Sequence, residues 1–209
     1  GLAEPGDIHN ICGTCEITYV CVDQPVASPN FNVRCHVLPN RWVTFFVLNT
    51  GGKALEWFHS VLCTDMSPQA FFEDYVPSVL ARFFARGDLD QAEQDLPVYV
   101  PFLGGSRYTL EQLKASFSGV TLETTRDDLL MSLIRGNALY HGEHLREVGR
   151  LVRLGRKVTT TGGGARIPGF IEVKKRWTGD FDYVYQDESS LVGAALLGRL
   201  YQMGESTIE

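Results

Sequence analysis

The sequence lacks the features that mark several classes of protein. Among its 209 residues, no apolar run approaches the roughly 18 residues of a membrane span. The first ten residues, GLAEPGDIHN, do not resemble a signal peptide. The formal net charge is −6 and the basic residues are scattered, whereas binding to nucleic acid requires a concentrated basic footprint. We therefore expect neither a membrane nor a nucleic acid as a partner.

Patterns typical of disulfides and metal sites are also sparse. Five cysteines are an odd number, which favours reduced thiols and predicts a cytoplasmic protein. Cys12 and Cys15 form a C-x-x-C pair, but no second pair at similar spacing completes a zinc site. A redox pair usually begins a helix, whereas strand-like residues follow here. We expect free thiols and keep metal or redox chemistry as the alternative.

The sequence does have the composition of one α/β domain. Its residues are 44% hydrophobic and 21% charged, and a chain of this length can bury its own core. The runs IHNICG, EITYVCV, VRCHVLP and RWVTFFVL predict short strands near the beginning. Helical periodicity then takes over and alternates with further strands. This order predicts an α/β fold of the ribonuclease H/actin-like type, a mixed β-sheet flanked by helices.

Several local patterns predict where the helices lie. The run GGKALEWFHSVL predicts a helix with Val61 on its core face, and the acidic stretch 86–94 predicts an exposed connection. Thr125 and Asp128 form a capping box at the start of a long helix, for which Gly155 is a natural stop.

Other residues carry expectations about surfaces and packing. His141 and His144 are expected on a helix surface, and VKKRW is expected on a solvated helix face. In the last helix, SSLVGAALLGRLYQM, the small residues Gly193, Ala194 and Gly198 predict close packing on the sheet.

Three glycine turns follow predicted strands. The stretch TTTGGGARIPGF holds three consecutive glycines, which cost conformational entropy unless something lies against them. It does not match the Walker A motif, because Phe170 stands where lysine is needed, or the Rossmann motif, because the third glycine is absent. The other two turns lie in LNTGGKALEW and CGTCE. Backbone N–H groups at such turns favour binding of an anion or a nucleotide. The alternative is that each turn is merely tight. The three turns together predict one shared cleft.

Several segments together resemble the C-terminal domain of the FGGY carbohydrate kinases, which belong to the actin-like ATPase superfamily. The segment ASFSGVTLETTRDDLLMSLIR resembles the second signature of that family, except that Arg135 replaces an acidic or amide residue. VPFLGGSRY is similar to the family's LPYLxGER segment, and TTTGGGARIPGF resembles the adenosine-contacting turn of xylulokinase-like members. SSLVGAALLG resembles the closing helix. The resemblance implies that residues 1–209 form one ATP-binding C-terminal domain.

This resemblance implies ATP and magnesium as cofactors and assigns no metal ligand in this chain. It implies a nucleotide site on the three turns: Gly13 and Thr14 at the phosphates, Gly52 and Glu56 at the phosphate or ribose region, and Gly163 and Gly164 around adenosine. The family's adenine-contacting Asn is replaced by Pro168. We expect a larger residue at Gly164 to obstruct ATP more than it harms the fold.

The resemblance also implies transfer of the γ-phosphoryl group of ATP to a sugar or polyol hydroxyl, with a ketopentose favoured by the GGGARxP form. The catalytic base would be an aspartate upstream of Gly1. An N-terminal sugar-binding domain would hold the sugar at the domain interface, so we expect this chain alone to be inactive. The face left for that domain would also allow a homodimer. The alternative is a stand-alone actin-like nucleotide-binding or regulatory module.

Overall fold

A six-stranded sheet forms the centre of the computed structural model, which describes residues 1–203. Its strand order is β3-β4-β2-β1-β7-β8. The strands are β1 (Ile8–Cys12), β2 (Glu16–Val22), β3 (Asn32–Cys35), β4 (Trp42–Leu48), β7 (Lys157–Thr161) and β8 (Asp182–Tyr185). The four β-rich runs of the early sequence account for β1 to β4, because their β-branched and aromatic residues suit a pleated, half-buried surface.

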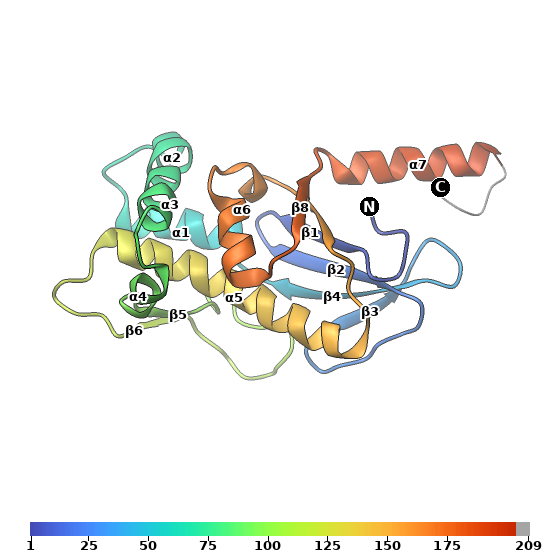
Figure 1. Cartoon of the computed structure of the whole chain (residues 1–209), viewed down its shortest axis with the longest axis horizontal. Coiled ribbons are helices and arrows are strands. Elements are labelled where there is room, and N and C mark those ends of the chain that lie inside the picture. The colour runs from blue at the N-terminus through green and yellow to red at the C-terminus, as the bar shows by residue number, and fades with distance from the viewer. Residues whose placement is uncertain (204–209) are drawn as a thin grey trace.

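The sheet combines antiparallel and parallel pairs. β2 lies antiparallel to β1 and β4, and β3 lies antiparallel to β4. β7 lies parallel to β1 and to β8. Parallel neighbours require long crossover connections, and helices supply them here. A meander followed by helix–strand alternation thus produces the predicted mixed sheet with helices around it (Figure 1).

The helices lie largely between β4 and β7 in the sequence. They are α1 (Gly52–Leu62), α2 (Pro68–Ala70), α3 (Val76–Phe84), α4 (Leu89–Gln94), α5 (Arg126–Leu151), α6 (Phe170–Val173) and α7 (Ser189–Met203). A two-stranded sheet, β5 (Val98–Val100) with β6 (Ser116–Ser118), lies beside α5. No helix of the described chain is both long enough and apolar enough to cross a bilayer.

Helix α5 covers one face of the six-stranded sheet, which we call the α5 face (Figure 1). The predicted capping box is present, with the Thr125 hydroxyl and the Asp128 carboxylate each paired to the other's backbone N–H. The helix ends at Leu151 rather than near Gly155, because Val152 already has an extended backbone. Tyr140, Leu145 and Val148 pack from α5 onto the strands.

Two of the helix predictions were wrong. The stretch 86–94 is not simply a connection, because Asp88 caps α4 by accepting from the Gln91 N–H at 3.0 Å and Ala92 is buried. Val61 is 54% exposed, whereas its neighbour Leu62 is partly buried against the core.

The prediction that α7 packs closely on the sheet was also wrong. Nothing lies within 4 Å of a Cβ placed on Gly193 or Gly198, and Leu191 is 66% exposed. In Figure 1 the helix stands beyond the face of the sheet opposite to α5, which we call the outer face. Small residues permit a helix to approach a sheet closely, but they do not by themselves make the helix pack there.

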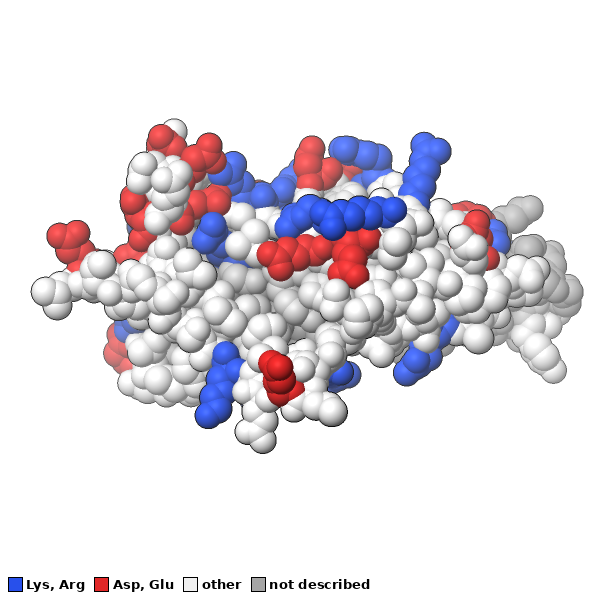
Figure 2. Space-filling model, turned by 90° about the horizontal axis from the view of Figure 1, so that it is seen from below, with Lys and Arg blue, Asp and Glu red and all other residues white. Residues whose placement is uncertain are grey.

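Charged side chains on the surface are mixed in sign. On the face seen in Figure 2, the basic groups lie singly or next to acidic groups. Exposed ion pairs such as Arg82–Asp127, at 2.5 Å, and Arg126–Asp65, at 2.6 Å, account for part of this pattern.

Candidate functional site

The β1–β2 hairpin holds Gly13 and Thr14, and the start of α1 is bonded to it. The Gly52 N–H donates to the Gly13 carbonyl at 2.8 Å, and the Lys53 N–H donates to the Thr14 carbonyl at 3.1 Å. A Cβ on Gly52 would lie 2.8 Å from the Gly13 oxygen, which is too close for any side chain. The glycines of LNTGGKALEW therefore bring the beginning of a helix onto the hairpin.

The glycine turn after β7 contacts the same hairpin from its other side. Gly162 has φ +93°, and a Cβ there would lie 2.6 Å from the Cys12 carbonyl oxygen, so both conformation and space require glycine. A Cβ on Gly164 would lie 3.1 Å from the Cys12 Cβ. Gly163, in contrast, is exposed and has no atom within 4 Å of its Cβ position. Of the three consecutive glycines, only Gly163 has open space beside it.

The three turns predicted to share one cleft thus meet at residues 12–16. Within the described chain, no hydrogen bond uses the backbone N–H groups of Thr14, Gly163 or Gly164. Glu56, one turn into α1, is exposed and pairs with Lys53 at 2.8 Å. The arrangement offers unpaired backbone donors on an exposed hairpin and on an exposed turn, which is a suitable surface for an anionic ligand.

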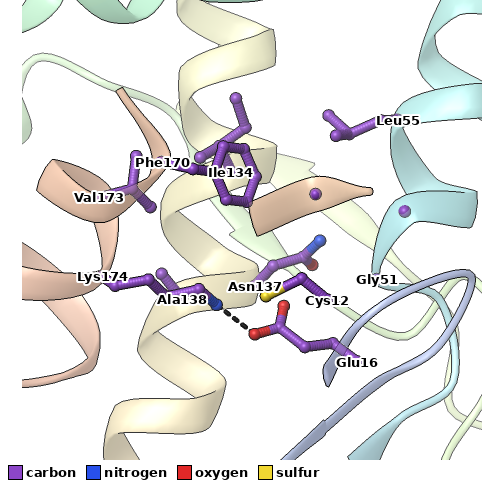
Figure 3. Close-up of a pocket in the computed structure, with 12 residues that line it drawn as sticks. Cys12, Glu16, Gly51, Leu55, Ile134, Asn137, Ala138, Phe170, Val173 and Lys174 are labelled. Carbon is purple, nitrogen blue, oxygen red and sulfur yellow. Dashed lines mark hydrogen bonds and ion pairs between the residues drawn. The ribbon is translucent and has the colours of Figure 1, made fainter. Parts of the chain in front are cut away.

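Beneath the hairpin lies a buried polar cluster that the sequence analysis missed. It surrounds a small cavity of about 20 Å³, which is room for about one water molecule. Glu16 and Lys174 form an ion pair there, and their side chains are only 6% and 4% exposed (Figure 3). Asn137 also lines this cavity. Its Oδ1 atom is buried and has no hydrogen-bond partner among the described residues.

The expectation that VKKRW lies on a solvated face was wrong for three of its five residues, Val173, Lys174 and Trp177. Lys174 is 3% exposed and Trp177 is 4% exposed. The chain here forms a π-helical segment, Lys174–Thr178, that follows α6 and packs on α5. Lys174 is buried together with Val173, Trp177 and Thr178, while Lys175 stays exposed. The signal available in the sequence was the apolar neighbour Val173, which is buried beside Lys174.

His141 belongs to this cluster and is fully buried, which corrects the expectation of a surface position. Its Nδ1 lies 2.9 Å from the Thr18 hydroxyl, and its Nε2 lies 3.7 Å from Glu16 Oε1. Burial lowers the pKa of His141 to about 3, so the ring is neutral at ordinary pH. His144, by comparison, is partly exposed.

The charges of the ion pair stabilise each other. Burial favours neutral Glu16, yet the pKa of this carboxyl is lowered by the neighbouring positive groups, His141 and Lys174. Because His141 is neutral above about pH 3, Lys174 is the cation that remains. Burial likewise opposes the charge on Lys174, and Glu16 raises its pKa. Both groups are therefore ionised near neutral pH.

The two cysteines of the C-x-x-C pair lie at the hairpin. Cys12 is buried at the end of β1, and its thiol donates to Asn10 Oδ1 at 2.9 Å. Burial, and then the nearby Glu16 charge, raise the pKa of Cys12 to about 11, which makes a thiolate scarce. Cys15 is partly exposed, and neither cysteine forms a disulfide in this structure. The interpretation of both cysteines as small buried strand residues holds for Cys12 but not for Cys15, which lies in the turn between β1 and β2.

No family model and no curated protein matches this sequence. Solved structures do share its fold. A xylulose kinase from Rhodospirillum rubrum has a TM-score of 0.83 and 19% identity, over 97% of this chain and 39% of that one. A gluconate kinase from Lactobacillus acidophilus (TM-score 0.75, 18% identity) and a glycerol kinase from Plasmodium falciparum with ADP (TM-score 0.75, 14% identity) each match over 93% of this chain and 38% of their own.

The chain spans less than half of the length of these kinases. At such low identities the likeness concerns the fold. It nevertheless includes nearly the whole of this chain, in agreement with the order of motifs in the sequence. The chain therefore shares the fold of a part of these xylulose, gluconate and glycerol kinases.

Proposed function

We propose that residues 1–209 form the ATP-binding domain of a carbohydrate kinase, which transfers the γ-phosphoryl group of MgATP to a hydroxyl of a sugar or polyol. The observation that carries this proposal is the meeting of three glycine-bearing turns at one hairpin. In phosphoryl transfer the protein contributes mainly positioning and charge neutralisation. Unpaired backbone donors around an open turn suit the positioning of a nucleotide.

Each turn has its own part in this proposal. Gly13 and Thr14 would contact the phosphates, because Thr14 is exposed and its N–H has no hydrogen-bond partner within the described chain. Gly52 would contribute the start of α1, where the helix dipole favours an anion, although its own N–H is already bonded to Gly13. Gly163 and Gly164 would border the adenosine, with Gly163 presenting bare backbone to it.

The proposal includes magnesium as a companion of the nucleotide. Within residues 1–203, no group of three or more His, Cys, Asp or Glu side chains is arranged so that it could hold a metal ion. Glu56, the acid assigned to this region, is already paired with Lys53. We therefore assign no residue of this chain to the metal. Mg²⁺ usually keeps several waters and binds substrate phosphates, and it would supply charge neutralisation.

The proposal also includes a second domain, which would bind the sugar and carry an aspartate as the base. Its support is that the kinases of the same fold have chains of which this one covers 38–39%. We propose a ketopentose as the substrate, supported by the GGGARxP form and by the fold shared with xylulose kinases. Five unpaired cysteines support a cytoplasmic location.

Gly163 provides a cleaner test than Gly164. Its backbone, at φ −60° and ψ −40°, is ordinary helical geometry, and a Cβ there has no atom of the chain within 4 Å. A Gly163→Val substitution should therefore leave the melting temperature unchanged. If adenosine lies on this turn, ATP affinity measured by calorimetry with the chain should fall about tenfold or more, since tenfold corresponds to about 1.4 kcal/mol.

Gly87→Val is the matched control, because Gly87 is also exposed and has open space beside it. It should change neither stability nor ATP affinity. Gly164→Val would disturb the packing on Cys12, so a loss of ATP binding there would not separate ligand from fold. Unchanged ATP affinity in a folded Gly163→Val chain would refute the adenosine assignment. Absence of ATP binding by the wild-type chain would refute the proposed function.

A further inference from the structure

The ion pair between Glu16 and Lys174 joins two parts of the candidate site that are 158 residues apart in the sequence. Glu16 is the first residue of β2, directly after the turn of the hairpin. Lys174 follows α6, which comes directly after the glycine turn. Figure 3 shows the two side chains pointing toward each other beneath the hairpin, from opposite sides of the small cavity.

On one side, Glu16 is fixed to the hairpin and to the start of α1. The Asn10 side-chain amide donates to Glu16 Oε1 at 3.1 Å. A Cβ on Gly51 would lie 2.7 Å from the Glu16 Cβ, so the backbone that begins α1 lies directly on this side chain. The Glu16 carboxylate therefore moves with the part of the site that we assign to the phosphates.

On the other side, Lys174 is fixed to the glycine turn. It begins the π-helical segment Lys174–Thr178, which is anchored on α5 where the Thr178 hydroxyl donates to the Ala138 carbonyl at 3.0 Å. Only α6 and the residues 167–169 separate it from the turn Gly164–Arg166. The β1–β7 ladder, which pairs Ile11 with Thr161, joins the two strands that lead into the hairpin and the turn. Beyond this ladder, Lys174–Glu16 is the single hydrogen bond within the described chain that joins residues 10–16 to residues 162–178.

Stability alone does not explain a buried ion pair at this place. Removing two charges from water is costly, and well-packed apolar residues of similar size often serve a fold equally well or better. An ion pair differs from apolar packing because it is directional: the ammonium must face the carboxylate for either charge to be tolerated. It therefore fixes the position of the α6 side of the turn relative to the hairpin.

We propose that Glu16 and Lys174 are positioning residues that hold the phosphate-binding hairpin and the adenosine-binding turn in register, so that ATP binds as one ligand across both. This inference rests on the proposed function. Two subsites held at the correct separation bind a linked ligand more tightly than either fragment, because the second contact is effectively intramolecular. Loss of this register should weaken the binding of ATP but leave the binding of its separate fragments, a nucleoside and a polyphosphate, unchanged.

The test compares ATP, adenosine and inorganic tripolyphosphate by calorimetry with the wild-type chain and a Glu16→Leu/Lys174→Met double variant. The double variant removes both charges together, so it leaves no buried charge unpaired. We expect it to remain folded by circular dichroism and to bind ATP about tenfold more weakly, with both fragments within about twofold of wild type. Lys175→Met, an exposed neighbour on the same segment, should match wild type for all three ligands.

A folded double variant with wild-type ATP affinity would overturn the inference, and so would equal losses for ATP and both fragments. If the double variant does not fold, Glu16→Gln takes its place, because it keeps the volume and an acceptor for Lys174. Glu16→Gln should lower the affinity for ATP about threefold and leave the affinities for adenosine and tripolyphosphate unchanged. A wild-type affinity for ATP would again overturn the inference. A wild-type chain that binds no ATP fails the proposed function itself, which distinguishes the two failures.

Discussion

The two faces of the six-stranded sheet differ in how completely they are covered. On the α5 face, Ile8, Val20, Phe46 and Leu48 are each at most 1% exposed and pack against α5. On the outer face, Cys21 and Val47 are buried, but Tyr19, Val43 and Phe45 are only partly buried, and a groove of about 460 Å³ lies between this face and α7. The groove is lined by Ile11, Tyr19 and Val43 from the sheet and by Val192, Leu196 and Leu197 from α7.

This difference indicates where the stability of the chain and its candidate chemistry lie. Glu16 and Thr18 of β2 lie on the same face as Val20 and are buried, so the hairpin adjoins a buried part of the sheet. Sites on rigid elements hold their geometry better than sites on loops. The outer face, in contrast, contributes little to the core within residues 1–203.

Adjacent phenylalanines of β4 provide the most direct way to test this comparison. Phe46 points to the α5 face and is 0% exposed, whereas Phe45 points to the outer face and is partly exposed. We expect Phe46→Ala to lower the free energy of unfolding by about 3–5 kcal/mol, since it leaves a cavity in the core. Phe45→Ala should cost about 1 kcal/mol, because it loses one tilted contact with Tyr19.

Urea unfolding of both variants, followed by circular dichroism, measures these values. The pair is matched in residue type, strand and sequence position, so intrinsic strand propensity cancels. Equal losses for the two variants would contradict the view that the outer face is outside the core.

The sequence predicted the elements of the α5 face better than it predicted the buried polar cluster beneath the hairpin. Short β-rich runs and the capping box at Thr125 depend on local rules, and both were confirmed. The convergence of the glycine turns on the hairpin was also predicted, because each turn follows a strand. The roles of these glycines in binding a nucleotide stay predictions.

The buried cluster was missed because it depends on contacts that no local pattern encodes. Lys174 lies among basic residues that normally face solvent, and its partner in the interior, Glu16, is 158 residues away in the sequence. His141 lies in a long helix whose fully buried face is set by the packing of α5 between the sheet and the π-helical segment. Polar residues inside a protein are specified by their partners, which here come from distant parts of the chain.

The pH dependence of stability tests whether His141 is as deeply buried as the α5 face implies. Its folded pKa is about 3 and its ordinary value is 6.5, so between these values the unfolded chain binds a proton that the folded chain does not. Stability due to His141 is therefore present above pH 6.5 and is lost as the pH falls. Between pH 7.5 and pH 5 this loss should amount to about 2 kcal/mol.

A His141→Gln variant provides the comparison, because glutamine retains polar contact with Thr18 and does not titrate. Urea unfolding of both chains at pH 7.5 and pH 5 should give a decrease about 2 kcal/mol smaller in the variant. The range stays above the window in which Glu16, whose pKa is lowered, begins to protonate. An equal decrease in both chains would mean that His141 is protonated in the folded state.

The smallest change in the free energy of unfolding is expected for a substitution on α7. This helix offers the simplest test of whether the two faces of the sheet really differ. Leu191 of α7 is 66% exposed, whereas Leu145 of α5 is 3% exposed, and both lie within helices. Leu145→Ala should lower the free energy of unfolding by about 2–5 kcal/mol. Leu191→Ala should change it by at most about 0.5 kcal/mol, because an exposed leucine loses little burial and alanine is the better helix former. A loss above about 1.5 kcal/mol for Leu191→Ala would mean that α7 closes over the outer face in solution, and the groove of the present structure would then be part of a second core.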